Sequence, residues 1–239
     1  MKYQAKMLGR ETTAGQLMVF RLERPEGFDF LAGQFCFVSV PDIGLQDKEG
    51  LRRPLSIASS PLEKDLLFTV RLTESAFKRT LRGMAESGRV EIESPTGLFT
   101  LPDSRERPLV FLAGGMGIAP FRSMLRYSAD AETGHRITLF YSSRIQEEAL
   151  FLDEFYDIAA KTPSIGVVAT ITRPEQSAKS WQGRTGRLTP STIRDGCAYW
   201  STATYYLSGP PAMVEGMRAM LEEMAIGMDR IKREIWTGY

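Results

Sequence analysis

The sequence predicts two domains: an N-terminal antiparallel six-stranded β-barrel, followed by a C-terminal α/β domain with a parallel five-stranded sheet. Short runs rich in β-branched and aromatic residues, separated by Gly and Pro, fill residues 1–100, which is typical of a small barrel. From Pro108 onward, apolar runs alternate with helical patterns, which is typical of a parallel sheet covered by helices. We place the boundary in the polar segment 101–108, giving a barrel domain over 1–104 and an α/β domain over 105–239.

Within the predicted barrel, four runs have the composition and length of strands. Residues 88–95 show the pattern well, because Val90 and Ile92 alternate with charged side chains. The other predicted strands cover 15–25, 33–41 and 65–73. A helical pattern follows at 77–87.

Strands and helices alternate in the second half. The predicted strands cover 108–115, 136–143, 165–173, 204–211 and 230–236. The predicted helices cover 118–130, 146–161, 189–196 and 212–227. Pro120 lies near the first turn of its helix, and Thr189 with Pro190 forms a helix start. One face of the last helix, interpreted as core rather than binding surface, carries Met213, Met217, Met220, Leu221 and Met224.

Composition and charge exclude several classes of function. The 239 residues carry 30 basic and 29 acidic groups, so no nucleic-acid partner is expected. No apolar run is long enough for a membrane span, and the N-terminal sequence lacks the apolar core of a signal peptide. Cys36 and Cys197 form no C-x-x-C pair, which excludes a metal or iron–sulfur site built from cysteines alone and favours a reducing, cytoplasmic location. The single histidine, His135, is interpreted as a solvated turn residue.

Two glycine-containing turns follow predicted strands of the α/β half. In "AGGMG", Gly114, Gly115 and Gly117 would let a diphosphate approach the backbone at a helix start. The spacing differs from the fingerprint G-x-G-x-x-G, so a tight turn without a ligand explains it equally well. The second turn, "GPP", contains Gly209 and Pro210. Two such turns at the carboxyl ends of parallel strands form the crevice where open α/β sheets bind nucleotides.

The turn after the next strand offers hydroxyls and a cation where a coenzyme ribose would lie. A site for an unphosphorylated ribose often has an acidic residue there. This chain has Ser142, Ser143 and Arg144, which suit a 2′-phosphate better, so NADP is slightly favoured over NAD. The alternative is that Arg144 is solvated or pairs with Glu147 or Glu148.

The segment "RRPLSIASSP", residues 52–61, places a cation, a fixed φ angle, an apolar side chain and a hydroxyl in order. In a barrel beside a nucleotide domain, Arg53 could pair with a phosphate and Pro54 would fix the turn. Leu55 would cover an aromatic ring, and Ser56 would hydrogen-bond its polar edge. A flavin cofactor has a phosphate, a flat aromatic face and a polar ring edge at about this separation. The alternative is a surface arginine pair at the end of a barrel strand.

Five segments together resemble the ferredoxin–NADP reductase superfamily of flavoprotein reductases over nearly the whole chain. They are "RRPLSIASS", "EIESPTGLFTL", "LAGGMGIAPF", "LSGPPAM" and the final aromatic residue, Tyr239. The resemblance implies an FAD-binding barrel followed by an NAD(P)-binding domain, with hydride passing from the nicotinamide to the flavin. It also implies that electrons leave to a separate acceptor, such as a ferredoxin, a flavodoxin, an oxygenase component or a small molecule.

The resemblance also implies roles for individual residues. Ser56 and Ser208 would border the hydride path. Tyr239 would stack on the flavin until the nicotinamide displaces it, with Trp236 as a second candidate. Because "SAFKRTL" stands where many relatives have Gly-x-x-Ser, Phe77, Lys78, Arg79 and Thr80 become the phosphate candidates. Further cofactor contacts are expected at Val70, Leu72, Met116, Pro120 and Met213. Leu55 and Ser208 replace the family's tyrosine and cysteine, which affects the tightness of flavin binding and the rate of hydride transfer.

Two other functions are compatible with the sequence. The chain could be the reductase component of an oxygenase or part of a fixed electron-transfer complex. In another class, it could be a flavin- or nucleotide-binding sensor without turnover. The sequence determines neither the acceptor nor the oligomeric state.

Overall fold

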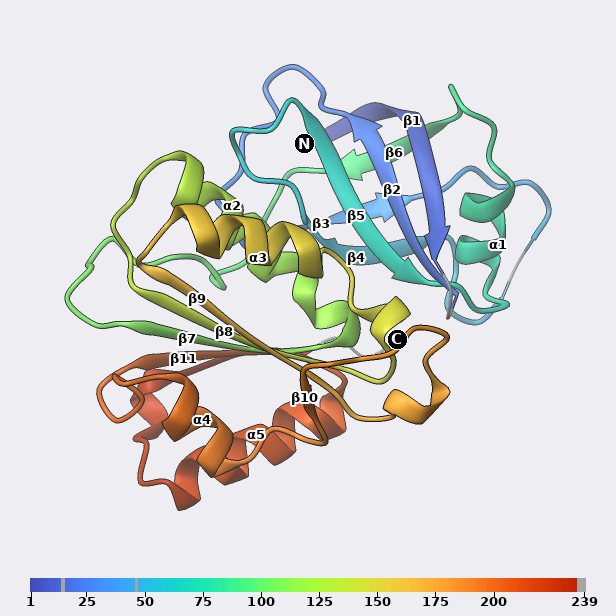
Figure 1. Ribbon diagram of the computed structural model, residues 1–239. Helices are drawn as coiled ribbons and strands as arrows, with labels where there is room; N and C mark the ends of the chain where they lie inside the picture. The colour runs from blue at the N-terminus through green and yellow to red at the C-terminus, as the bar shows by residue number, and fades with distance from the viewer. Residues whose placement is uncertain (14–15, 46, 236–239) are drawn as a thin grey trace.

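The computed structural model describes residues 1–13, 16–45 and 47–235, and it contains two six-stranded β-sheets (Figure 1). The first sheet is antiparallel, with the strand order β4-β3-β6-β1-β2-β5. Its strands are β1 (Lys2–Thr13), β2 (Leu17–Glu23), β3 (Phe35–Ser39), β4 (Arg52–Ser56), β5 (Asp65–Arg71) and β6 (Arg89–Glu93). The six antiparallel strands predicted for the first half are confirmed.

The antiparallel sheet curls until its two edges meet. Directly after the edge strand β4, the amide of Ala58 donates to the carbonyl of Leu67 in the opposite edge strand β5, at 2.8 Å. The amide of Leu67 in turn donates to the Ser59 hydroxyl at 3.1 Å. Pro54, which has no amide hydrogen, lies within β4, and an edge strand tolerates it because one side of the strand needs no ladder donor.

Helix α1 (Ala76–Gly83) packs against the barrel core. Ser75 is its N-cap, since the Ser75 hydroxyl accepts a hydrogen bond from the amide of Lys78. Phe77 and Leu81 lie one turn apart and are fully buried among the apolar side chains inside the barrel. The sequence placed this helix one residue later and ended it four residues too late.

The second sheet is parallel, with the order β10-β9-β8-β7-β11-β12. Its strands are β7 (Leu109–Gly114), β8 (Ile137–Ser143), β9 (Ile165–Ile171), β10 (Arg184–Thr185), β11 (Thr204–Gly209) and β12 (Ile231–Ile235). The predicted count of five strands was wrong. Strand β10 consists of two exposed residues that pair with the end of β9, so it leaves no apolar pattern in the sequence.

Helices cover both faces of the parallel sheet (Figure 1). They are α2 (Ile118–Asp130), α3 (Leu152–Lys161), α4 (Pro190–Gly196) and α5 (Pro211–Glu223), with short 3-10 turns at Gly115–Gly117, Gln146–Glu148, Pro174–Gln176 and Met228–Arg230. Helices α2 and α3 pack on one face, and α4 and α5 on the other. The single helix predicted over 146–161 is divided, because Phe151 adopts a left-handed φ of 62° before α3 begins.

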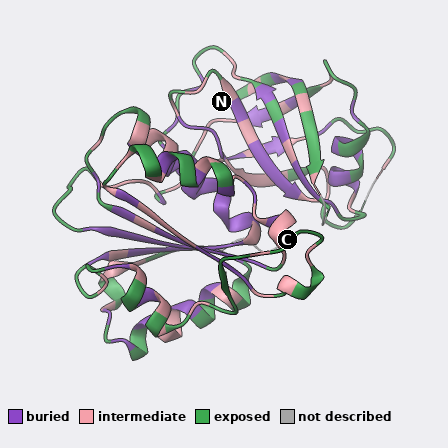
Figure 2. Cartoon of the chain, viewed as in Figure 1, coloured by how far each residue is buried: buried purple, intermediate pink, exposed green. Residues whose placement is uncertain are grey.

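Burial follows the arrangement of the barrel and of the helices on both faces of the parallel sheet (Figure 2). All six residues of β7 are buried, as expected for a central strand covered on both faces. On α5, Met217, Leu221 and Met224 are buried in the core, whereas Met213 and Met220 are half-buried. No helix in the described part of the chain has the length and apolar character needed to cross a membrane.

Helix α2 joins the two sheets through buried polar contacts. The Arg122 guanidinium donates to the carbonyl of Ala58 and to both oxygens of Glu63, at 2.9 to 3.1 Å, and also to Glu154 on α3 at 2.8 Å. Burial opposes the charge on Arg122, but the hydrogen bonds that it donates to Glu63 and the negative charges of Glu63 and Glu154 raise its pKa. These contacts hold the barrel edge against the α/β half.

The structure corrects one prediction about a turn. His135 lies in a turn but is only 5% exposed. Its Nδ1 lies 2.8 Å from the Thr133 hydroxyl, and its Nε2 lies 2.9 Å from the carbonyl of Pro102. The ring therefore holds the segment around Pro102 against the turn before β8. The prediction of a solvated residue was wrong, because local sequence does not show which distant segment packs over a turn.

Candidate active site

The order of the parallel sheet reverses between β7 and β11, and glycines lie at the carboxyl ends of both strands. The turn Gly115–Gly117 follows β7, and Gly209 ends β11. A Cβ atom at Gly209 would lie 3.2 Å from the backbone of Gly114, and one at Gly117 would lie 2.3 Å from the carbonyl of Ser208. The two turns pack backbone against backbone, which glycine permits. This is the position where open α/β sheets form a ligand crevice.

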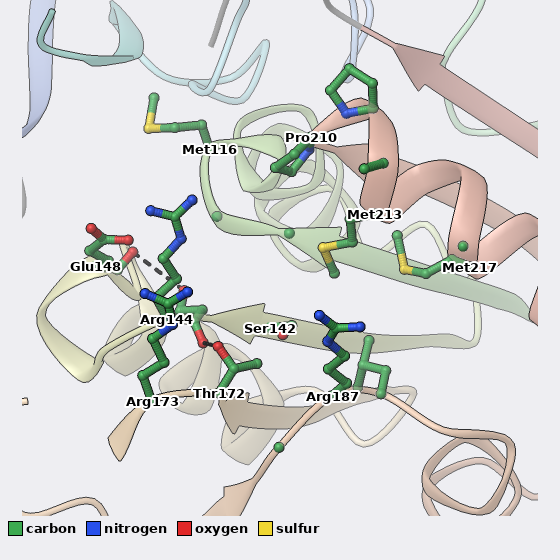
Figure 3. A pocket seen from close by; sticks show the side chains of 18 of the residues that line it. Met116, Ser142, Arg144, Glu148, Thr172, Arg173, Arg187, Pro210, Met213 and Met217 are labelled. Atoms are coloured by element: carbon green, nitrogen blue, oxygen red, sulfur yellow. Dashed lines mark hydrogen bonds between the residues drawn. The ribbon is translucent and has the colours of Figure 1, made fainter. Parts of the chain in front are cut away.

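A cavity of about 930 Å³ opens in front of these turns (Figure 3). Eight of the residues predicted to bind cofactor line it: Gly114, Gly115, Met116, Ser142, Ser143, Arg144, Pro210 and Met213. Gly117, Pro120 and Gly209 are not among the lining residues, and Gly117 and Gly209 lie where the two turns pack together. Met217 and Met220 also line the cavity, so the methionine face of α5 is partly a binding surface and not only core.

Three arginines reach this cavity from the ends of neighbouring strands (Figure 3). Arg144 follows β8, Arg173 follows β9 and Arg187 follows β10. Within residues 1–13, 16–45 and 47–235, none of the three forms an ion pair, so their positive charge is available to an anion. The sequence analysis missed Arg173 and Arg187. For Arg173 the signal was present, because it lies at the carboxyl end of a predicted strand, whereas Arg187 follows β10, which carries no pattern in the sequence.

A fourth arginine enters the cavity from the barrel. Arg71, the last residue of β5, donates two hydrogen bonds to the carboxylate of Glu148, at 3.0 and 3.1 Å. The Glu148 side chain is 9% exposed. The pair links the two halves of the molecule at the cavity wall, and it was not predicted, because it depends on how the two sheets are oriented.

Polar side chains also meet where the end of β4, the strand "RRPLS", contacts the parallel sheet. The Ser56 hydroxyl donates to the carboxylate of Glu234 at 3.0 Å. Glu234 is 8% exposed and lies opposite Ser208 in the pairing of β12 with β11. The Ser208 hydroxyl is fully buried and has no hydrogen-bond partner among the described residues. The structure therefore places Ser56 against the Glu234 carboxylate and Ser208 beside Glu234 on the neighbouring strand, and Glu234 was not predicted from the sequence.

The predicted flavin-phosphate residues gather around the start of α1. The Arg53 guanidinium lies 2.7 Å from the Glu49 carboxylate and stands over the Phe77 ring at 5.6 Å. Asp47 accepts a hydrogen bond from the first amide of α1, at Ala76, and this bond lowers the pKa of the Asp47 carboxyl. The Arg53 guanidinium and the N-terminus of α1 each bind a carboxylate here. Both groups attract anions, so this region has the chemistry of an anion site.

Other predicted flavin contacts are mostly interior. Lys78 is 7% exposed, and burial lowers the pKa of its amine. The Thr80 hydroxyl is buried without a partner among the described residues. Arg79 is exposed, Pro54 and Leu55 are half-buried, and the side chains that form part of the barrel core are Val70, Leu72 and Phe77. The buried Lys78 amine and the unpartnered Thr80 hydroxyl have the chemistry of phosphate ligands, whereas Arg79 is exposed. Tyr239 and Trp236 lie outside the described residues.

Residues 111–219 match the family of oxidoreductase NAD-binding domains. Among curated proteins, the chain is 26% identical over 216 residues to the reductase component of propane 2-monooxygenase from Gordonia sp. (strain TY-5), covering 89% of this chain and 61% of that protein. It is 34% identical over 141 residues to methane monooxygenase component C from Methylosinus trichosporium, covering 58% of this chain and 40% of that protein. The chain thus spans about 60% of the length of the propane 2-monooxygenase reductase.

Solved structures show the same fold. The cytochrome P450 reductase GcoB from Amycolatopsis aligns with a TM-score of 0.83 and 26% identity, covering 100% of this chain and 70% of that chain. A ferredoxin NADP⁺ reductase from Neisseria gonorrhoeae, with bound FAD and NADP, aligns with a TM-score of 0.80 and 22% identity, covering 98% of both chains. The resemblance predicted from the five sequence segments is confirmed.

Proposed function

Because residues 111–219 form an oxidoreductase NAD-binding domain and the chain has the fold of ferredoxin–NADP reductase-like flavoprotein reductases, we propose that it is an NAD(P)H-dependent flavoprotein reductase. It passes hydride from NAD(P)H to FAD and electrons onward to a separate acceptor. The proposal divides the chain into an FAD-binding barrel over residues 1–104 and an NAD(P)-binding domain over 105–239.

The observation that carries the proposal is the position of the cavity. It lies at the carboxyl ends of the parallel strands, and β11 extends from it to the buried cluster of Ser56, Ser208 and Glu234. A coenzyme in the cavity would thus have its reactive end near the barrel. The flavin supplies the redox chemistry when bound. The Ser56 hydroxyl and the Glu234 carboxylate are placed to hold a proton at the junction of the two halves.

The three arginines favour NADPH as the reductant. A dianionic 2′-phosphate is well matched by guanidinium groups, which offer several donors in a fixed plane. The hydroxyls of Ser142 and Ser143 line the same wall of the cavity. NADH, which lacks this phosphate, would leave Arg144, Arg173 and Arg187 without an anionic partner.

For the acceptor we propose an oxygenase component, a ferredoxin or a flavodoxin. The support is that curated relatives include the reductase component of propane 2-monooxygenase, methane monooxygenase component C and the electron transfer component of anthranilate 1,2-dioxygenase from Acinetobacter baylyi (strain ATCC 33305 / BD413 / ADP1). We also propose a cytoplasmic location, since the two cysteines are free and buried, in keeping with a reducing compartment.

The test is a reduction experiment on the purified protein. The expected result is a yellow protein that releases FAD, identified by chromatography against FMN. Its flavin absorbance should bleach within seconds when NADPH is added without oxygen. A colourless protein that cannot be reconstituted with FAD would contradict the proposal. Flavin that binds but is bleached by neither NADPH nor NADH would instead support a sensor without turnover.

A further inference from the structure

Arg71 is the one cavity-lining residue that the described part of the barrel contributes, because every other residue of the wall belongs to the α/β half. It is therefore a direct link between the coenzyme cavity and the flavin half. Its guanidinium is held by Glu148 through two hydrogen bonds. A change in the Arg71–Glu148 hydrogen bonds on coenzyme binding would therefore affect both halves of the molecule.

Glu148 is an unexpected residue for this wall. Among the described residues that line the cavity it is the one acidic side chain, and the other charged side chains are arginines. A carboxylate with 9% exposure is costly unless a cation and hydrogen bonds compensate it. Arg71 supplies both, so the pair is neutral while the cavity holds no anion.

The pair lies beside the turn that would receive the coenzyme diphosphate. The buried Tyr141 hydroxyl is 3.4 Å from the carbonyl of Glu148 and 3.5 Å from the carbonyl of Gly115. The Ser143 hydroxyl also donates to the carbonyl of Glu148, at 3.4 Å. These contacts fix the turn Gln146–Glu148 against the glycine turn, so that an anion at Gly115 comes close to the Arg71 guanidinium.

We propose that Glu148 is a placeholder for the coenzyme diphosphate. In the empty cavity its carboxylate holds Arg71 in position, and the diphosphate takes over Arg71 when the coenzyme binds. One bidentate partner replaces another, so the guanidinium stays in place. Glu148 then loses its compensating cation, and this cost lowers coenzyme affinity. Coenzyme binding is thereby coupled to release of an ionic contact between the two halves. The inference rests on the proposed function of the cavity.

The test measures binding of ADP-ribose, which carries the diphosphate but no nicotinamide, to the flavin-loaded protein by calorimetry. Glu148→Gln should tighten ADP-ribose by about three- to tenfold, because a neutral amide releases Arg71 more easily. Binding of 2′-AMP, which has no diphosphate, should stay within about twofold. Asp157→Asn, which removes an exposed carboxylate from α3, is the control for net charge and should change neither affinity.

Arg71→Met should weaken ADP-ribose by about tenfold. In that background, Glu148→Gln should produce no further tightening, because the carboxylate has no cation to withhold. The placeholder role is overturned if Glu148→Gln leaves ADP-ribose affinity unchanged or weakens it, or if it tightens 2′-AMP equally. Failure of the proposed function looks different: the unsubstituted protein would then bind neither ADP-ribose nor NADPH.

Discussion

The two halves of the molecule hold their candidate ligand-binding residues in different ways. In the α/β half, backbone turns and the ends of parallel strands surround an open cavity of about 930 Å³, and Arg144, Arg173 and Arg187 reach it without ion pairs among the described residues. In the barrel, Arg53 is paired with Glu49, and a carboxylate from Asp47 already meets the N-terminus of α1.

This difference shows what each kind of site depends on. The cavity lies at the switch point of the sheet order, beside glycines that allow two backbones to touch. The candidate flavin site depends on side chains whose present partners belong to the loop before β4. Flavin binding at Arg53 therefore requires an exchange of partners, whereas the α/β arginines are ready for an anion.

The largest effect is expected where the two halves are joined. Arg122→Met leaves the carboxylate of Glu63 without its ion-pair partner and leaves Glu154 only the more distant Arg126, at 3.9 Å; it also removes a donor from the carbonyl of Ala58. Breaking a buried ion pair in this way costs about 3–5 kcal/mol in the free energy of unfolding. Urea denaturation measures it. Arg126→Met, on the same helix but half-exposed, is the control and should cost less than about 1 kcal/mol.

Two glycines of one turn separate packing from conformation in the α/β half. Gly117→Ala places a Cβ 2.3 Å from the Ser208 carbonyl, so the two turns must move apart, at a cost of about 1–3 kcal/mol. Gly115→Ala meets no atom within 4 Å and costs about 1 kcal/mol, because its φ of +51° is left-handed. Thermal unfolding should rank them in that order. Equal losses would mean that backbone contact does not build the cavity.

Coenzyme preference tests whether the unpaired arginines are available to an anion. Arg144→Ala and Arg187→Ala should each raise KM for NADPH by about tenfold, the value of a charge-assisted hydrogen bond, and leave KM for NADH nearly unchanged. Steady-state kinetics with both coenzymes decides the matter. An equal rise for NADPH and NADH would place these guanidinium groups elsewhere on the coenzyme, and the preference for NADPH would be discarded.

The smallest effect is expected at the exposed carboxylate of the barrel. Glu49 is 60% exposed, so Glu49→Gln should tighten FAD by no more than about threefold, since solvent already weakens its hold on Arg53. Arg53→Ala should instead weaken FAD by about tenfold or more. Flavin fluorescence during titration of the flavin-free protein measures both. A large gain from Glu49→Gln would show that the loop competes strongly with the phosphate.

The sequence by itself determined several elements and the glycine turns. Helix α2 has the predicted bounds, and α4 begins at the predicted cap Thr189, because apolar periodicity and capping are local properties. The strand–glycine–helix pattern around Gly115 likewise located the cavity, since the position of a turn at a strand end follows from chain order in a parallel sheet.

Only the tertiary structure decided which distant side chains meet. Strand β10 was missed because two paired residues carry no pattern, and the partners of Ser56 and Arg71 lie 178 and 77 residues away in the chain. Whether a cation faces a phosphate, as proposed for Arg144, or a carboxylate, as at Arg53, depends on the packing of loops and halves around it. Pairing energies between charges depend on distance and burial, and neither quantity is present in the order of residues.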